Sequence, residues 1–403
     1  MRIVYLHQYF NTPQMSGGTR SYEMARRLVA AGHQVHMITT DRSPQARAGW
    51  RVTEEAGIIV HWLPVPYSNR MAYSERIKAF GRFAWYAARR AAAFPADVVF
   101  ATSTPLTIAL PAVYAARRQK IPMVFEVRDL WPELPIAVGA LKGPLIPPAR
   151  WLERFAFRNA SYIVALSPGM KEGIARQGVS PERIFVIPNS ADIALFSVGE
   201  EAGRAFRSQF EWLQDRPLIL YAGTLGRING VGYLAEIAAR MAHLDAEVRF
   251  MVIGDGYEKA SIIERAKSLG VLNRNFFLLP SLPKKEMPAV YSAATIATSL
   301  VIDLPALWAN SANKFFDALA AGKPIAINYN GWQADLLRET GAGIVMPPAD
   351  AEAAAQQLAE LVHDHERLVR AGAAAQKLAE ERFDRDRLAA ELEAVLTKAV
   401  ATA

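Results

Sequence analysis

The stretch "LWANSANKFFDALAAGKPIAINYNG", residues 307–331, places a helix directly before a buried strand. Apolar residues recur at helical spacing in its first half, and the sequence Ala-Gly-Lys-Pro ends that helix. The run "IAINY" that follows is typical of a strand covered on both faces of a sheet. The helix also carries an amide, an ammonium and a carboxylate at Asn313, Lys314 and Asp317. The helix–strand unit therefore indicates an α/β fold, and its three polar side chains are candidate functional residues.

The same alternation of buried strands and amphipathic helices extends along the chain in both directions. Further strands are predicted at "RIVYLHQ", "QVHMITT", "ADVVFAT", "IPMVFEV" and "ASYIVALS", and, in the second half, at "LILYAGT", "EVRFMVIGDG", "NFFLLPS" and "TIATSLV". This pattern predicts an α/β fold with two doubly wound, Rossmann-like domains that face a central cleft. We expect the domains at 1–196 and 197–383, a loose charged linker near 195–216, and a last helix, 384–403, that is a candidate to pack back on the first domain.

Composition and charge narrow the function classes. The 403 residues contain no cysteine, which excludes disulfides, Cys-ligated zinc and thiol nucleophiles. Residues 1–196 hold 24 Lys and Arg against 13 Asp and Glu, a net charge of +11, whereas the remainder carries −4. The basic half indicates an anionic partner, for which lipid, a phosphorylated substrate and nucleic acid are the candidates. Because no nucleic-acid recognition module is visible, we expect no nucleic-acid partner.

Two segments bear on membranes. The N-terminus is too short and too quickly polar for a secretory signal, so we expect a cytoplasmic protein. The uncharged run at 98–116 is long enough to cross a membrane, but Ser103, Thr104 and Pro105 interrupt it, which predicts a strand at 98–102, a turn and a buried helix. The helix at 69–94 mixes arginines with aromatic residues, which fits either a lipid-facing surface or a core helix with a solvated basic face.

Glycine-rich turns follow several strands, where ligands bind in open α/β sheets. "MSGGTR" (15–20) brings Gly17 and Gly18 before a helix, which suits an anion, although a plain turn is the alternative. In "YAGTLGRINGVGYL" (221–234), Gly223 opens the backbone and Arg227 supplies a cation suited to a diphosphate, unless it is an exposed turn residue. "VIGDGYE" (252–258), with Gly254, is explained by a tight turn alone.

Two charged clusters complete the candidate site. "VFEVRDLWPEL" (124–134) places Arg128, Asp129 and Glu133 at a strand end, as ligand-binding groups or as a structural ion pair. Lys314 stands at the positive end of its helix, where a cation is unfavourable unless an anion is bound. Asp317 is three residues further on the same face and could accept from the two hydroxyls of a nucleotide ribose. A surface Lys–Asp pair is the alternative.

Taken together, these motifs resemble the family-four glycosyltransferases of the GT-B fold over nearly the whole chain. "GGTRSYEMARRLVAAGHQVHMIT", "ALSPGMKEGIARQGV", "RIFVIPNSAD", "VIGDGYE" and "FFDALAAGKPIA" occur in the family's order. "HQYF…SGGTR", "VRDLWPE", "AGTLGRINGV" and "NKFFDALAAGKP" resemble the branch of bacterial amino-sugar transferases of O-antigen and capsule assembly, such as the L-fucosamine transferase.

The sequence also departs from the family pattern. Of the family's two glutamates separated by seven residues, the first position holds Ala309 and the second Asp317, so Asn310 or Asn313 would partly replace the sugar-facing glutamate. The usual Arg and Lys of the diphosphate loop fall on Thr224 and Asn229, and a common His–Asp pair reads Arg128–Asp129.

The resemblance implies sugar transfer with retention from a UDP-sugar to a polyprenyl-diphosphate-linked acceptor, by a protein peripheral to the inner face of the cytoplasmic membrane. It implies no metal and no cofactor, because cations of the protein stabilise the diphosphate. The residues expected to be catalytic are Arg227, Lys314, Arg128 and Asp129. The expected donor-binding residues are Gly17, Gly18, Gly223, Thr224, Asn229, Asn310, Asn313, Asp317 and Gly254. The expected acceptor-binding residues are His7, Arg20, Ser103, Thr104 and Glu133. The rival interpretations are a nucleotide-sugar epimerase of the same architecture and a non-catalytic nucleotide- or membrane-binding relative.

Overall fold

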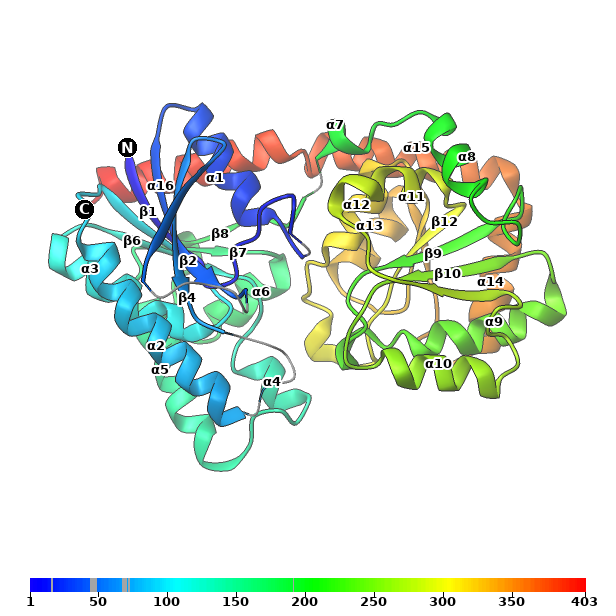
Figure 1. Ribbon diagram of the computed structural model, residues 1–403, viewed down its shortest axis with the longest axis horizontal. Coiled ribbons are helices and arrows are strands. Elements are labelled where there is room, and N and C mark those ends of the chain that lie inside the picture. Colours follow the sequence, from blue (N-terminus) through cyan, green and yellow to red (C-terminus); the bar gives the residue numbers. More distant parts are fainter. Residues whose placement is uncertain (16, 44–48, 67–70, 72, 191) are drawn as a thin grey trace. The chain divides into compact units, whose positions relative to one another are not determined.

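The chain divides into two compact units in a computed structural model, which describes all residues except 16, 44–48, 67–70, 72 and 191 (Figure 1). The N-terminal unit comprises Met1–Thr12, Gly18–Pro188 and Asp386–Ala403, and the C-terminal unit comprises Pro13–Gly17 and Asn189–Arg385. The first residues of the predicted helix at 69–94, and Ser16 of "MSGGTR", lie outside the described residues.

The N-terminal unit has an eight-stranded sheet in the order β3-β4-β2-β1-β5-β6-β7-β8, parallel except for the edge strand β3. Two of its central strands, 98–102 and 123–127, are fully buried and mostly apolar, as expected for a sheet with helices on both faces. The strands are β1 (Arg2–Leu6), β2 (Gln34–Asp41), β3 (Arg51–Glu55), β4 (Ile58–Pro64), β5 (Val98–Thr102), β6 (Met123–Val127), β7 (Tyr162–Ala165) and β8 (Ile184–Val186).

Seven helices of this unit cover the sheet or follow its strands. The uncharged run that could have crossed a membrane forms β5, a turn and α3, as predicted from its Ser-Thr-Pro interruption. The helices are α1 (Arg20–Ala30), α2 (Tyr73–Ala92), α3 (Ala109–Gln119), α4 (Glu133–Ala137), α5 (Ile146–Asn159), α6 (Pro168–Ala175) and α16 (Arg385–Ala401). None of the helices in the described part of the chain combines the length and the apolar character needed to span a membrane.

The last helix belongs to the N-terminal unit, where α16 lies beside α1 and β1 (Figure 1). Asp386 accepts from the Nε of Arg27 at 2.5 Å, and Glu393 pairs with Nε2 of His33 at 2.8 Å. The contacts explain why residues after 385 group with the start of the chain.

The C-terminal unit has a six-stranded parallel sheet in the order β11-β10-β9-β12-β13-β14. The helix–strand unit that opens the sequence analysis is α12 followed by β13. The strands are β9 (Leu218–Ala222), β10 (Arg249–Ile253), β11 (Phe276–Leu279), β12 (Ile296–Ser299), β13 (Ile325–Ile327) and β14 (Gly343–Val345). The helices are α7 (Ile193–Phe196), α8 (Glu200–Arg207), α9 (Gly232–Leu244), α10 (Lys259–Ser268), α11 (Met287–Ala293), α12 (Asn313–Ala320), α13 (Trp332–Thr340), α14 (Ala351–His363) and α15 (His365–Arg382).

Two parts of the fold differ from the sequence prediction. The hairpin β3–β4 was not predicted. The segment expected to be a loose linker contains α7 and α8, and α8 packs on α11. Phe206 is buried, and Gly203 lies so close to Ser292 that a Cβ would come within 2.7 Å of its backbone carbon. Most of the charged residues of this segment lie on the exposed side of an amphipathic helix. The high proportion of charged residues therefore did not indicate a linker.

Candidate functional site

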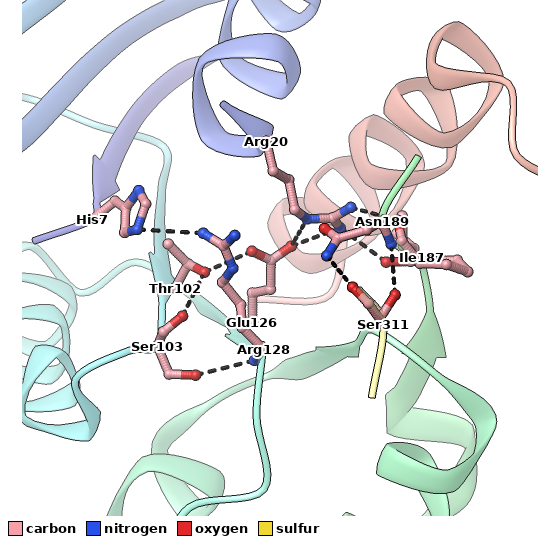
Figure 2. Close-up of polar contacts among 10 residues, drawn as sticks. His7, Arg20, Thr102, Ser103, Glu126, Arg128, Ile187, Asn189 and Ser311 are labelled. Atoms are coloured by element: carbon pink, nitrogen blue, oxygen red, sulfur yellow. Dashed lines mark hydrogen bonds and ion pairs between the residues drawn. The ribbon is translucent and has the colours of Figure 1, made fainter. Parts of the chain in front are cut away.

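The carboxyl ends of three neighbouring strands gather polar side chains in the N-terminal unit (Figure 2). His7 follows β1, Thr102 ends β5, and Glu126 lies within β6. Because parallel strands end at one edge of a sheet, residues distant in sequence come together there.

Glu126 is the centre of this cluster and has no exposed surface. Its carboxylate accepts from Nη2 of Arg20 at 2.8 Å, from Nε of Arg20 at 3.0 Å, and from Oγ1 of Thr102 at 2.6 Å. Arg20 also donates to the carbonyl oxygens of Ile187 and Pro188. Burial raises the pKa of Glu126, but the charges of Arg20 and Arg128 and the hydrogen bonds from Arg20 and Thr102 outweigh it, so the pKa is lowered. Arg20 therefore ties α1 to β6 and the end of β8, and this geometry favours a structural role over the predicted acceptor contact.

His7 and Arg128 form the part of the cluster with unused hydrogen-bond capacity. Nη1 of Arg128 lies 3.4 Å from Nε2 of His7. Burial, Arg128 and Arg42 hold the pKa of His7 well below 6.5, so the imidazole is neutral, and Nδ1 carries its proton if Nε2 accepts from Arg128. Nδ1 is buried without a hydrogen-bond partner. In the described part of the chain Arg128 has no carboxylate partner, so the structural Arg128–Asp129 ion pair is not formed.

Asp129 lies on the other side of the same loop. Its Oδ2 accepts from Oγ1 of Thr104 at 3.4 Å, and the Ser103 hydroxyl accepts from the backbone N–H of Arg128 at 3.1 Å. Burial raises the pKa of Asp129, while Arg128 and Thr104 oppose that shift. Ser103 and Thr104 thus hold the loop that carries Arg128 and Asp129.

Glu133 begins α4 and faces a different neighbour from the residues above. Its Oε2 is buried without a partner, as is Oε2 of Glu153 on α5. Burial and the nearby Glu133 raise the pKa of Glu153 to about 8. The sequence analysis missed Glu153, because a single glutamate in a helix pattern gives no signal of burial. The predicted acceptor role of Glu133 stays a prediction.

Lys314 is the central cation of the C-terminal unit. Its Nζ lies 5.3 Å from the ring centroid of Tyr221, and its Cε would be 3.0 Å from a Cβ at Gly223. Among the described residues, no hydrogen bond or ion pair reaches this ammonium. Burial lowers the pKa of Lys314 to about 8, and Asp317 opposes that shift. Lys314 is half-buried, and an ammonium that is partly removed from water without a partner is unfavourable, so the position is suited to an anion.

Two backbone turns meet beside Lys314. The N–H of Gly223 donates to the carbonyl of Ile253 at 2.9 Å, and the N–H of Leu225 to that of Asp255 at 3.0 Å. A Cβ at Gly254 would lie 2.0 Å from the Gly223 carbonyl oxygen, so only glycine fits there. Gly254 therefore allows the two turns to pack closely together, which is consistent with the tight-turn explanation of "VIGDGYE".

The glycine-rich loop 223–230 carries the other predicted cation. Arg227 is exposed, and its guanidinium lies 5.0 Å from the ring centroid of Tyr257. Thr224 is exposed, and its carbonyl accepts from the Tyr221 hydroxyl at 2.9 Å. The N–H of Asn229 donates to Gly226 and closes a turn. Arg227 therefore has a long, exposed side chain on a loop that backbone hydrogen bonds hold in place.

Two asparagines lie near the start of α12. Asn310 precedes the helix and Asn313 is its first residue, and they differ in whether the side-chain amide is already hydrogen-bonded. Asn310 donates from Nδ2 to the Leu307 carbonyl at 2.6 Å and accepts from the N–H of Ala312 at 3.2 Å. The side chain of Asn313, at the start of α12, makes no hydrogen bond within the described residues. The geometry therefore favours Asn313 over Asn310 as the residue that replaces the family's sugar-facing glutamate.

Asp317 has a partner that the sequence analysis missed. Its Oδ2 lies 2.6 Å from Nζ of Lys284, which precedes α11 in a single turn of 3₁₀ helix, Lys284–Glu286. The exposed fractions of the two side chains are 11% and 20%. The only available signal was the basic pair Lys284–Lys285 after a predicted strand.

Gly17 and Gly18 precede α1 and are exposed. Gly17 has φ +121°, a region that favours glycine, and the Gly18 carbonyl accepts from Nδ2 of Asn11 at 3.3 Å. Their predicted contact with an anion stays a prediction.

Relatives described as glycosyltransferases resemble the chain at low identity. The putative colanic acid biosynthesis glycosyl transferase WcaI of Escherichia coli is 26% identical over 286 residues, 67% of this chain and 70% of that protein. The 2-deoxystreptamine glucosyltransferase of Streptomyces kanamyceticus is 25% identical over 339 residues, 83% of this chain and 79% of that protein. The structure of HepE from Anabaena, in complex with UDP and glucose, has a TM-score of 0.74 at 16% identity and covers 99% of this chain and 100% of that chain.

Two family models match in succession, one to each half of the chain. A model described as "Glycosyl transferase 4-like domain" matches residues 17–190, and one described as "Glycosyl transferases group 1" matches residues 204–378. The two matches together cover most of the chain, which belongs to the glycosyltransferases of the GT-B fold.

Proposed function

We propose that the chain transfers an N-acetylated amino sugar, such as N-acetyl-L-fucosamine, from a UDP-sugar to a polyprenyl-diphosphate-linked glycan, with retention, in surface polysaccharide assembly. The observation that carries the proposal is the ammonium of Lys314, which lies half-buried beside Gly223 without a hydrogen-bond or ion-pair partner among the described residues, one helical turn before Asp317. A nucleoside diphosphate supplies both the missing anion and a ribose diol for the carboxylate.

The donor-binding residues that we propose lie in the C-terminal unit. Lys314 and Arg227 stabilise the negative charge that develops on the leaving diphosphate, and Asn313 contacts the sugar. The glycosidic C1–O bond breaks with its electron pair on the diphosphate oxygen. The acceptor hydroxyl oxygen bonds to C1 on the same face, and its proton passes to the diphosphate. Two protein cations perform the charge stabilisation that a metal ion performs in other transferases, so we propose a reaction that needs no added metal.

The acceptor-binding residues that we propose lie in the N-terminal unit. The Nδ1–H of His7 and the spare N–H groups of Arg128 are buried or half-buried donors, suited to the oxygen atoms of a sugar or phosphate. Asp129, held by Thr104, accepts from an acceptor hydroxyl. The neutral state of His7 suits it to donate rather than to act as a charged group.

Exposed aromatic and basic side chains on three packed helices of this unit support a membrane-bound acceptor. Helix α3 packs against both α2 and α5 (Figure 1). Trp85 on α2 and Trp151 on α5 are each 60% exposed, and the guanidinium of Arg89 lies 4.1 Å from the Trp85 ring centroid. Aromatic rings with flanking arginines are the composition of peripheral surfaces that bind anionic lipid. Phe83, on the opposite side of α2, belongs to the core, and the lipid contact of the exposed face is part of the proposal.

The test is UDP release by the purified protein with a panel of UDP-sugars, with and without a polyprenyl-diphosphate-linked acceptor and in the presence of EDTA. We expect release that requires acceptor and persists in EDTA. Release of UDP without acceptor, or conversion of the UDP-sugar to an epimer, would contradict transferase activity. Thermal stabilisation by UDP-sugars with no turnover on any lipid-linked acceptor would support the binding-module alternative.

A further inference from the structure

We propose that Lys284 is a donor-binding residue that forms, with Asp317, a two-residue clamp for the vicinal hydroxyls of the nucleotide ribose. The inference deepens the proposed function and rests on it, because it assigns the partner of Asp317 in the same nucleotide site. Lys284 was not among the residues that the sequence motifs indicated.

The ion pair between Lys284 and Asp317 is short and mostly buried. Its N–O distance is 2.6 Å, and the ammonium also lies 4.7 Å from the ring centroid of Phe196. Phe196 is buried and packs edge-on against Tyr291. By contrast, surface ion pairs of the C-terminal unit such as Arg216–Glu247, Arg265–Glu236 and Arg382–Glu339 each have at least one side chain that is half exposed or more. Exposed pairs contribute little and exchange freely, whereas this pair is oriented by its surroundings.

The chemistry of the pair matches a diol. A carboxylate only accepts hydrogen bonds, an ammonium only donates them, and a hydroxyl does both. Lys284 uses one lone-pair direction of Oδ2 and leaves Oδ1 of Asp317 to accept from a ribose hydroxyl. The ammonium retains further N–H groups that can donate to the neighbouring hydroxyl oxygen. The pair can therefore accept from one ribose hydroxyl and donate to the other. Asp317 alone could only accept, and Lys284 alone could only donate.

The placement on α12 fits one nucleotide. Lys314 and Asp317 are three residues apart and share a face of the helix. If Lys314 binds the diphosphate, the ribose of the same nucleotide lies about one turn along α12, beside Asp317. Asp317 also stands where the resembling family has glutamate. The shorter side chain keeps its carboxylate close to the α12 backbone, and the ammonium of Lys284 reaches it there.

The experiment measures ribose discrimination by calorimetric titration of the full chain with UDP and with 2′-deoxy-UDP. The variants are Lys284→Met, Lys284→Gln and, as a matched control, Lys285→Met, which removes an exposed neighbouring ammonium. We expect the unsubstituted protein and Lys285→Met to bind UDP roughly 10- to 100-fold more tightly than 2′-deoxy-UDP, the range for hydrogen bonds to charged groups. We expect either Lys284 variant to lower that ratio at least several-fold.

The outcomes separate this inference from the function on which it rests. If the Lys284 variants unfold at lower temperature but keep the discrimination ratio of the unsubstituted protein, the pair is only a tie between α11 and α12, and the clamp is wrong. If the unsubstituted protein binds UDP but ignores the 2′-hydroxyl, the clamp is also wrong while the transferase proposal stands. If it binds no uridine nucleotide at millimolar concentration, both fail.

Discussion

At the scale of single residues, the decisive group is the ammonium of Lys314, which forms no hydrogen bond or ion pair with the described residues. Lys314→Met keeps the approximate length of the side chain but removes the charge. We expect kcat with the UDP-sugar to fall about 100- to 1000-fold, the effect of losing one donor to a developing anion. Steady-state kinetics would check this, with thermal unfolding to show that the variant folds. Unchanged turnover would refute the assignment of Lys314 to the diphosphate.

The pKa of Lys314 gives a second prediction at this scale. Burial lowers that pKa to about 8, so the free enzyme loses the required charge as the pH rises through that value. We expect kcat/KM for the donor to be flat below pH 8 and to fall about tenfold per pH unit well above it. Lys314→Arg, whose guanidinium stays protonated, should abolish the fall even if its rate is lower. The same fall in both proteins would assign the titration to another group.

The sequence predicts residue types at the site better than it predicts their roles. Lys314 and Asp317 were identified because a charged pair interrupts an apolar helix, and the structure places Lys314 beside the predicted Gly223 loop. The sequence could not predict which of Asn310 and Asn313 has a free side-chain amide. That depends on the hydrogen bonds that the amide of Asn310 makes with the backbone of its own loop. Arg20 shows the same limit, since its partner Glu126 lies more than a hundred positions away.

At the scale of elements, Glu153 on α5 is a buried carboxyl group whose pKa is raised by burial and by Glu133 at the start of α4. The pKa of Glu153 is raised to about 8 from the ordinary 4.5, so the folded state binds more protons than the unfolded state between these values. Stability is therefore greatest at low pH within this window and falls as the pH rises through it.

Glu153→Gln tests this contact because the amide cannot ionise. Between pH 5 and pH 8, we expect the free energy of unfolding of the variant to gain about 3 to 5 kcal/mol relative to the unsubstituted protein. Denaturant titrations at both pH values measure the difference. Glu172→Gln, on α6 with a side chain that is 72% exposed, is the control and should show no such change. A parallel pH dependence in both variants would mean that Glu153 does not titrate abnormally.

Helices and strands were predictable where local periodicity and burial agree. The strand β5 and helix α3 follow from an apolar run broken by Ser-Thr-Pro, and α12 and β13 from an apolar helix ended by Gly and Pro. Helix α8 was not predicted because its charged residues outnumber its apolar residues. Phe206 marks the buried face of this helix, and that face is recognisable only from the packing of α8 on α11. The edge strand β3 has mostly exposed or half-exposed residues, so it lacks the apolar run of the inner strands.

At the scale of the whole molecule, charge is divided unevenly between the halves of the chain. The net charge is +11 over residues 1–196 and −4 over the remainder. The N-terminal unit also exposes Trp85 and Trp151, whose rings can enter the interface of a bilayer while neighbouring arginines remain with the headgroups. Charge attraction and ring insertion depend differently on salt, so one binding assay can separate them.

Co-sedimentation with vesicles that contain anionic lipid should therefore show two responses. Raising the salt concentration from about 0.05 to 0.5 M should weaken binding, because the Debye length falls to a few ångströms. The double variant Trp85→Gln, Trp151→Gln should bind several-fold less at every salt concentration, because it loses ring insertion and keeps its charge. Val369→Gln, which removes an exposed apolar side chain from the C-terminal unit, is the matched control and should bind as the unsubstituted protein does. Equal binding by all three proteins would place the lipid contact elsewhere, and no binding even at low salt would leave the acceptor's diphosphate and sugar as the sole anchors of the reaction.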